Sequence, residues 1–289
     1  MELDTICEKY SLSCEDRAEL SEYLTNRFAG LKENEPAAFE QLDVWKKLAS
    51  LAGLCGAAEV INQKVCRRLP VGFKHPDGVQ LKIYTSPAGE LPIIYVDDKD
   101  DFEALVTNIV HKGERPENIG KTGAAFVSGQ KTRLIILSSK PYSNLPASEL
   151  SLDKDDWAQK SLLIRRSHEC THFYTKQVYG VSNNILHDEL MADFVGLYDT
   201  FGFYRAEWFL KFLGIIPGSG DRLGVYTAGL SQKVTQAVTE IVEAAAHGLE
   251  KWSHSEGFLS LDYSARIREM VHMGITGMAD LNDMKEVSI

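Results

Sequence analysis

The chain has 289 residues, of which 44% are hydrophobic and 25% charged, so it can bury a sizeable core and is too apolar to be intrinsically disordered. Its formal net charge of −10 at pH 7 argues against partners with a phosphate backbone or an anionic membrane surface. Its longest weakly polar stretch, residues 48–61, falls short of the about 20 apolar residues that span a bilayer as a helix.

The chain begins with acidic residues ("MELDTICEKY") where a secretory signal would need a basic end followed by an apolar run. Its five cysteines are an odd number and contain no CxxC pair, a pattern typical of reduced thiols rather than of a disulfide scaffold. We therefore expect a soluble, cytoplasmic protein without nucleic-acid or membrane partners. These features do not indicate an oligomeric state.

Residues 1–69 form a predicted N-terminal helical section. Apolar residues recur at intervals of three and four over residues 15–28 and again over residues 37–66. Pro36 is the predicted start of the second of these helical stretches, because proline is favoured in the first turn of a helix.

Short β-prone runs follow, since proline and glycine residues interrupt the helical pattern from residue 70. We expect four such runs to form a small sheet: residues 81–86, 92–98, 123–129 and 132–139. The last two runs are separated by a tight turn at residues 128–131 and therefore predict an antiparallel hairpin. The charge run at residues 97–103 ("DDKDDFE") is expected to be a solvated turn.

Two helices are predicted after this sheet. The first covers residues 157–179 and ends before Gly180, since glycine readily adopts the left-handed conformation that closes a helix. The second covers residues 184–212, with a break expected at Gly202. The polar, proline-containing segment before the first helix predicts a loop.

The C-terminal section, residues 215–289, contains two more predicted amphipathic helices, over residues 230–249 and 260–275. The whole pattern predicts an α+β protein that is mostly helical, with a small, mainly antiparallel sheet beside the helix of residues 157–179. Between the two terminal sections, residues 70–214 form a central section with the sheet and the two helices that follow it.

Two histidines lie four positions apart in the first of those helices, within "HECTH". Residues four apart share one face of a helix, with Cβ atoms about 5–6 Å apart, so His168 and His172 can bind one ion. Zinc accepts imidazole ligands, and in catalytic sites it uses three protein ligands and keeps a fourth position for water. Glu189, brought back by the turn between the two helices, is the candidate third ligand.

Two further carboxylates have predicted roles around this ion. Glu169 lies about 100° around the helix from His168, so it lies beside the metal and can take a proton from water whose pKa the metal lowers. Asp193 lies one helical turn beyond Glu189 and can accept a hydrogen bond from the outer nitrogen of a ligand histidine. The predicted zinc site therefore contains three ligands, one base and one orienting residue.

Residues 168–196 resemble the HExxH plus ExxxD signature of the thermolysin-like zinc metallopeptidases, the gluzincins. The resemblance implies Zn²⁺ as the cofactor, with ligands at His168, His172 and Glu189, the general base at Glu169, and a carboxylate behind the ligands at Asp193. It also implies a zinc-dependent hydrolase that cleaves peptide bonds in a peptide or protein substrate.

A weaker likeness extends to residues 123–134, in the place where those enzymes have an edge strand that pairs with an extended peptide substrate. Ala124 occupies the place of a substrate-binding asparagine. No residue matches the donor that stabilises the oxyanion, and we take Tyr226, in the loop entering the C-terminal helices, as the candidate. Three alternative donors are Arg222, His247 and His254.

Two other functions fit parts of this pattern. Glu169 with His172 is also an ExxH pair, and Glu269 with His272 is a second one, as in di-iron carboxylate oxidoreductases. That interpretation leaves His168 and the ExxxD pair without a role. The other alternative is a zinc-binding module without catalytic activity, in which Glu169 would have no function.

Overall fold

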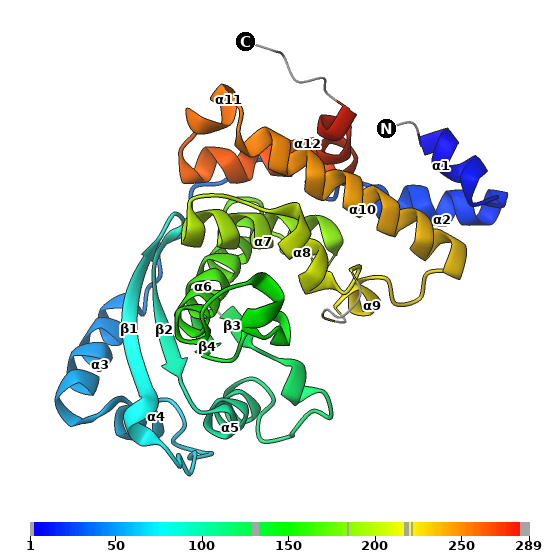
Figure 1. The fold of residues 1–289 in the computed structure, drawn as a ribbon. Helices are drawn as coiled ribbons and strands as arrows, with labels where there is room; N and C mark the ends of the chain where they lie inside the picture. The colour runs from blue at the N-terminus through cyan, green and yellow to red at the C-terminus, as the bar shows by residue number, and fades with distance from the viewer. Residues whose placement is uncertain (1–2, 129–132, 184, 217–219, 221, 284–289) are drawn as a thin grey trace. The chain divides into compact units, whose positions relative to one another are not determined.

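The computed structural model of the chain describes residues 3–128, 133–183, 185–216, 220 and 222–283 (Figure 1). It divides into two compact units. The helical unit combines Met1–Glu33 with Val181–Ile289, and the sheet unit is Asn34–Gly180. These boundaries differ from those of the three sections expected from the sequence, because segments from both ends of the chain pack within one unit.

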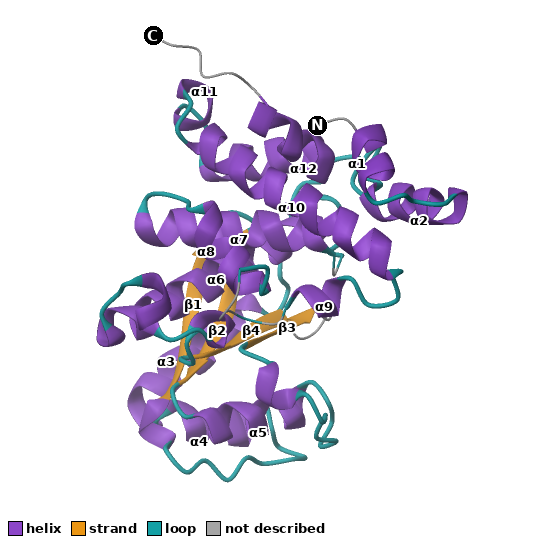
Figure 2. Cartoon of the chain, turned by 45° about the vertical axis from the view of Figure 1, so that its right-hand side comes forward, coloured by secondary structure: helices purple, strands orange, loops and turns teal. Residues whose placement is uncertain are grey.

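The sheet unit contains four strands in the order β1-β2-β4-β3, drawn in orange in Figure 2. The strands are β1 Val79–Ser86, β2 Gly89–Val96, β3 Ala124–Ser128 and β4 Arg133–Ser138. β1 with β2 and β3 with β4 are antiparallel, whereas β2 with β4 is parallel. The small, mainly antiparallel sheet and the pairing of the last two strands are confirmed. Of the predicted turn, residues 129–131 lie outside the described residues.

Helices cover both faces of this sheet. They are α3 Leu42–Cys55, α4 Ala57–Lys64, α5 Lys99–Ile109 and α6 Lys154–Val178. The first three share one apolar core, against which Ala125 and Val127 of β3 pack. Phe126 lies between these two residues in sequence and therefore faces the other side of the sheet, where it contacts Phe173 of α6 at 5.8 Å between ring centroids. The helix with the histidine motif thus packs directly on β3.

The predicted helix start at Pro36 is wrong, because the first helix of the sheet unit begins at Leu42. The residues before it make tertiary contacts instead. Phe39 is buried, and the guanidinium of Arg133 lies 5.1 Å from the centroid of its ring. Burial of this ring overrides the helical pattern of the sequence, because local propensity is weaker than tertiary packing.

The expected solvated turn at residues 97–103 is also wrong. Asp98 is the N-cap of α5, and its carboxylate accepts hydrogen bonds from two backbone N–H groups of the first turn. Asp101 and Glu103 are buried within this helix. Glu103 pairs with Lys140 at 3.4 Å, so its buried charge has a counterion.

The helical unit contains the remaining helices. They are α1 Leu3–Lys9, α2 Cys14–Leu24, α7 Leu186–Phe201, α8 Ala206–Leu213, α9 Leu223–Tyr226, α10 Gln232–Ser253, α11 Glu256–Leu259 and α12 Tyr263–Asp280. The predicted break at Gly202 is confirmed, since this residue has φ +74° and separates α7 from α8. None of the helices in the described ranges is long and apolar enough to cross a membrane.

The longest helix of this unit, α10, packs closely against α12. A Cβ atom built on Gly248 of α10 would lie 2.0 Å from the carbonyl oxygen of Met278 on α12. Only glycine allows this approach of the two backbones. The contact holds together the two helices that were predicted from the apolar pattern of the C-terminal section.

Candidate metal centre

The two histidines lie on a buried stripe along α6. This helix covers all but the last of the predicted residues 157–179 and ends before Gly180, which has φ +77°. Ser161, Arg165, His168 and His172 follow one another at intervals of four, three and four residues, so they share one face of the helix. The first three are buried and His172 is half-buried. Buried polar side chains need hydrogen-bond partners, and the two histidines contact each other.

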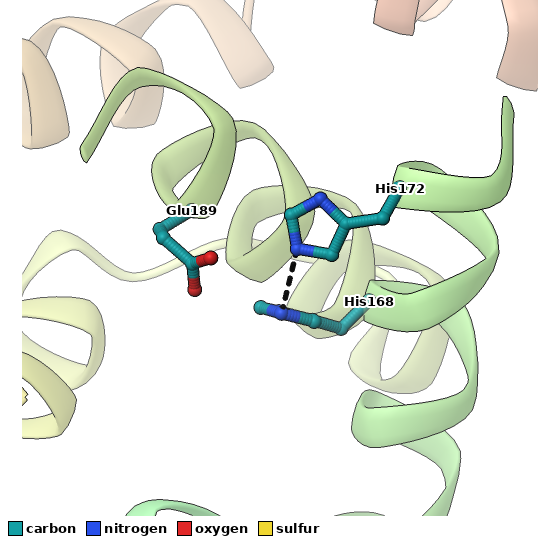
Figure 3. A group of neighbouring side chains, drawn as sticks. All are labelled: His168, His172 and Glu189. Carbon is teal, nitrogen blue, oxygen red and sulfur yellow. Dashed lines mark hydrogen bonds between the residues drawn. The ribbon is translucent and has the colours of Figure 1, made fainter. Parts of the chain in front are cut away.

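The imidazoles of His168 and His172 face each other through their Nε2 atoms, which lie 3.1 Å apart (Figure 3). Their rings are 78° apart in orientation, with centroids separated by 4.7 Å. Two nitrogen ligands at about 2.0–2.1 Å from a tetrahedral zinc ion would lie about 3.3–3.4 Å apart. The pair therefore has nearly the spacing that a shared metal ion requires.

A tyrosine that the sequence motif does not contain holds the first histidine. The hydroxyl of Tyr142 lies 2.9 Å from Nδ1 of His168, and both side chains are buried. Tyr142 comes from the loop that follows β4, in the segment "KPYSNLP". A hydrogen bond at Nδ1 leaves Nε2 directed at the neighbouring histidine, which is the arrangement expected behind a metal ligand.

Glu169, the predicted base, is half-buried on α6. Its carboxylate has no hydrogen bond or ion pair to any residue in the described part of the chain. A carboxylate that is not engaged with the protein can accept a proton from water or substrate. Its surroundings are therefore compatible with the predicted role.

The two carboxylates of α7 share one arginine. Glu189 and Asp193 are buried, and Arg222 donates from Nη2 to Oε2 of Glu189 at 2.7 Å and from Nη1 to Oδ2 of Asp193 at 2.9 Å. One guanidinium therefore compensates two buried anions. The predicted hydrogen bond from a ligand histidine to Asp193 stays a prediction, whereas the contact to Arg222 was not foreseen.

Tyr226, the predicted oxyanion donor, contacts the candidate third ligand. Its hydroxyl donates to Oε2 of Glu189 at 2.8 Å, the same oxygen that Arg222 contacts. Burial raises the pKa of the Tyr226 hydroxyl above its usual value, so this group stays protonated and able to donate at neutral pH. Arg222 and Tyr226, the two candidate oxyanion donors before the C-terminal helices, thus both contact Glu189.

The three predicted zinc ligands come from both units, the two histidines from the sheet unit and Glu189 from the helical unit. Within the sheet unit the histidines present two facing nitrogen atoms, and within the helical unit Glu189 presents a buried carboxylate that Arg222 and Tyr226 contact. Two imidazoles and one carboxylate are a donor set found in catalytic zinc sites. The residues present therefore fit this metal in number and in chemistry.

The two alternative histidine donors make local contacts on α10. His247 lies 3.8 Å from the carboxylate of Glu250, and Nδ1 of His254 lies 2.8 Å from the backbone oxygen of the same residue. Both histidines are exposed. These contacts favour Tyr226 and Arg222 over the histidines as donors.

β3, which packs on α6, is an edge strand with a free side. The carbonyl oxygen of Gly123 accepts a hydrogen bond from the last residue of β4, so the alternating ladder directs the backbone groups of Ala125 and Val127 towards β4. The backbone groups of Ala124 and Phe126 point away from the sheet. No hydrogen bond from a described residue satisfies these outward groups.

Comparison with known proteins places the chain in a family. The chain matches the model of a family of unknown function (DUF7005) over residues 61–133 and 130–285. No curated protein and no solved structure matches it. The matched residues cover more than half of the chain and include all of the candidate metal centre. The chain therefore belongs to the family DUF7005.

Proposed function

We propose that this chain is a zinc-dependent hydrolase, and specifically a metallopeptidase. The observation that carries the proposal is the pair of facing Nε2 atoms of His168 and His172, 3.1 Å apart, and Glu189 is the proposed third ligand. Glu169 follows the first of these histidines and keeps a carboxylate that no described residue engages. Ligands and base together form the minimum set for metal-assisted hydrolysis.

The residues around the group have distinct tasks in this proposal. When bound, Zn²⁺ polarises a carbonyl group and lowers the pKa of a coordinated water. Glu169 takes a proton from the attacking water and delivers it to the nitrogen of the leaving amine. Tyr226 turns its hydroxyl from the carboxylate of Glu189 to the carbonyl oxygen and donates a hydrogen bond to it as negative charge develops there. Arg222 holds the carboxylate of Glu189 in place.

An extended peptide is the substrate class that the sheet unit favours. The outward N–H and C=O groups of Ala124 and Phe126 can form a ladder with a peptide strand. β3 packs on α6, the helix of both histidines, through the contact of Phe126 with Phe173. Backbone pairing provides affinity without side-chain specificity, so we propose recognition through the peptide backbone.

The surroundings of the second ExxH pair disfavour a di-iron oxidoreductase. Glu269 and His272 of α12 are both exposed, and His272 lies 3.7 Å from the carboxylate of Glu33. Ligands of a di-iron centre project into the core of a helix bundle. Glu269 therefore offers a control position for the experiments on Glu169.

We also propose a cytosolic location. All five cysteines are thiols, and none forms a disulfide. Free thiols are typical of a reducing compartment. Fractionation of cells that express the tagged chain would test this proposal, and recovery in an oxidising compartment with paired cysteines would contradict it.

The function is tested by metal content and by substitution of the base. We expect purified protein to hold one zinc per chain and to cleave a peptide library. Glu169→Gln should keep the zinc and lose activity by about 10²–10⁴-fold, because proton transfer is lost. The matched control Glu269→Gln should change neither. Full activity of Glu169→Gln would contradict the role of Glu169 as the base. A wild-type chain that binds zinc and cleaves no peptide would instead indicate a metal-binding module, and loss of iron from Glu269→Gln would indicate the di-iron enzyme.

A further inference from the structure

The loop after β4 is tied to the histidine stripe of α6 at several points. The backbone N–H of Tyr142 donates to Oγ of Ser161 at 3.0 Å. The ring of Tyr142 lies 5.4 Å from the guanidinium carbon of Arg165, and its hydroxyl lies 2.9 Å from Nδ1 of His168. Three successive members of the stripe thus contact one tyrosine.

Arg165 fixes the backbone of the same loop. Its Nη1 donates to the carbonyl oxygens of Ser138 at 2.6 Å and Lys140 at 3.0 Å, and its Nη2 donates to that of Pro141 at 3.3 Å. Arg165 is buried, so these carbonyl groups stabilise its charge in place of water. The guanidinium therefore joins the end of β4 to the residue just before Tyr142.

Metal binding through Nε2 of His168 requires its proton to be on Nδ1, because only the unprotonated nitrogen has a lone pair for the ion. A buried N–H group without an acceptor would disfavour this tautomer. The oxygen of Tyr142 is the acceptor at the required position. The tyrosine can thus select the ligand form of the histidine and hold the orientation of its ring.

We infer that Tyr142 is a positioning residue for the metal ligand His168 and that Arg165 holds Tyr142 in place. The inference rests on the proposed function only in taking His168 as a ligand through Nε2. It adds two residues outside the HExxH and ExxxD signature, and one of them comes from a loop of the sheet unit. The expected consequence is on metal affinity first and on catalysis through it.

The main test is competition between the full-length chain and a chromophoric chelator for Zn²⁺. Tyr142→Phe keeps the ring and removes the hydroxyl, and we expect a loss of zinc affinity of about 10–100-fold. Arg165→Lys keeps the charge but not the planar fork, so a smaller loss is expected. The control is Tyr10→Phe, which removes a hydroxyl that donates to Glu240 at 2.7 Å and contacts no histidine.

A second measurement begins with the wild-type chain, for which the folding of variants does not matter. In the zinc-loaded wild-type chain, ¹⁵N chemical shifts of the His168 ring should show a protonated Nδ1 and a metal-bound Nε2. In metal-free protein, Tyr142→Phe should shift the Nδ1 signal of His168, whereas Tyr10→Phe should not. Coordination through Nδ1 would overturn the inference whatever the zinc affinity.

The outcomes separate this inference from the proposed function. A wild-type chain that binds zinc as tightly as Tyr142→Phe overturns the inference and leaves the proposed hydrolase intact. A wild-type chain that binds no zinc overturns the proposed function, and the ligand role assigned to His168 falls with it. Loss of affinity in Tyr142→Phe, with an unchanged Tyr10→Phe and a protonated Nδ1, supports the inference.

Discussion

The two helices that carry the candidate ligands stabilise them in different ways. On α6, His168 has an uncharged partner in the hydroxyl of Tyr142. On α7, Glu189 and Asp193 are buried carboxylates, and both pair with Arg222. An imidazole binds metal in its neutral form and needs only a hydrogen bond, whereas a buried anion needs a countercharge. Substitutions on α6 should therefore affect metal binding before folding, and those around α7 should affect folding first.

The largest effect, on zinc binding and hydrolysis, is expected for His168→Ala. Removal of one of three protein ligands should abolish stoichiometric zinc binding and hydrolysis together. The free energy of unfolding of the metal-free chain should fall by only about 1 kcal/mol, a common value for a single substitution. Metal analysis and urea unfolding of the metal-free protein measure the two effects, with the exposed His272→Ala as control. If His168→Ala retained zinc, His168 would not be a ligand, and the difference drawn between α6 and α7 would not hold.

The next largest effect is expected for Arg222→Ala. This substitution leaves the carboxylates of Glu189 and Asp193 without their shared counterion, and breaking a buried pair costs about 3–5 kcal/mol of the free energy of unfolding. Urea unfolding of the metal-free chain measures it. The double variant Arg222→Ala with Asp193→Asn should lose less than the sum of the single variants, since one buried charge is gone. Unchanged stability of Arg222→Ala would show that these carboxylates need no counterion.

An effect on folding smaller than that of Arg222→Ala is expected for Tyr226→Phe. One hydrogen bond to Glu189 is lost, which should lower the free energy of unfolding by about 1–2 kcal/mol. If Tyr226 also donates to the oxyanion, the turnover number should fall by about 10²–10³-fold with little change in KM. Steady-state kinetics on a cleaved peptide separate these effects. A loss confined to KM would assign the residue to substrate binding instead.

The parts of the fold that depend on local spacing were predictable from the sequence. α6 and its two histidines follow from the helical repeat, and the break at Gly202 follows from the backbone freedom of glycine. The hairpin of β3 and β4 follows from two β-prone runs joined by a short turn. In each case the residues that determine the structure lie close together in the chain.

The parts that depend on distant partners were not predictable. Tyr142 precedes His168 by 26 residues, and Arg222 follows Asp193 by 29, so no spacing rule connects them. The charge run at residues 97–103, which includes the first turn of α5, resembles a solvated turn because the burial of Glu103 depends on Lys140, 37 residues away in the chain. The polar stripe on α6 indicates only that its buried side chains require hydrogen-bond partners. It does not indicate that Tyr142 is one of these partners.

Anomalous diffraction at the zinc edge, from crystals of the zinc-loaded chain, would show whether His168, His172 and Glu189 bind one zinc ion. We expect a single peak bonded to Nε2 of both histidines and to a carboxylate oxygen of Glu189, at about 2.0–2.2 Å. No peak at this group, or a peak bonded to other residues, would contradict this expectation.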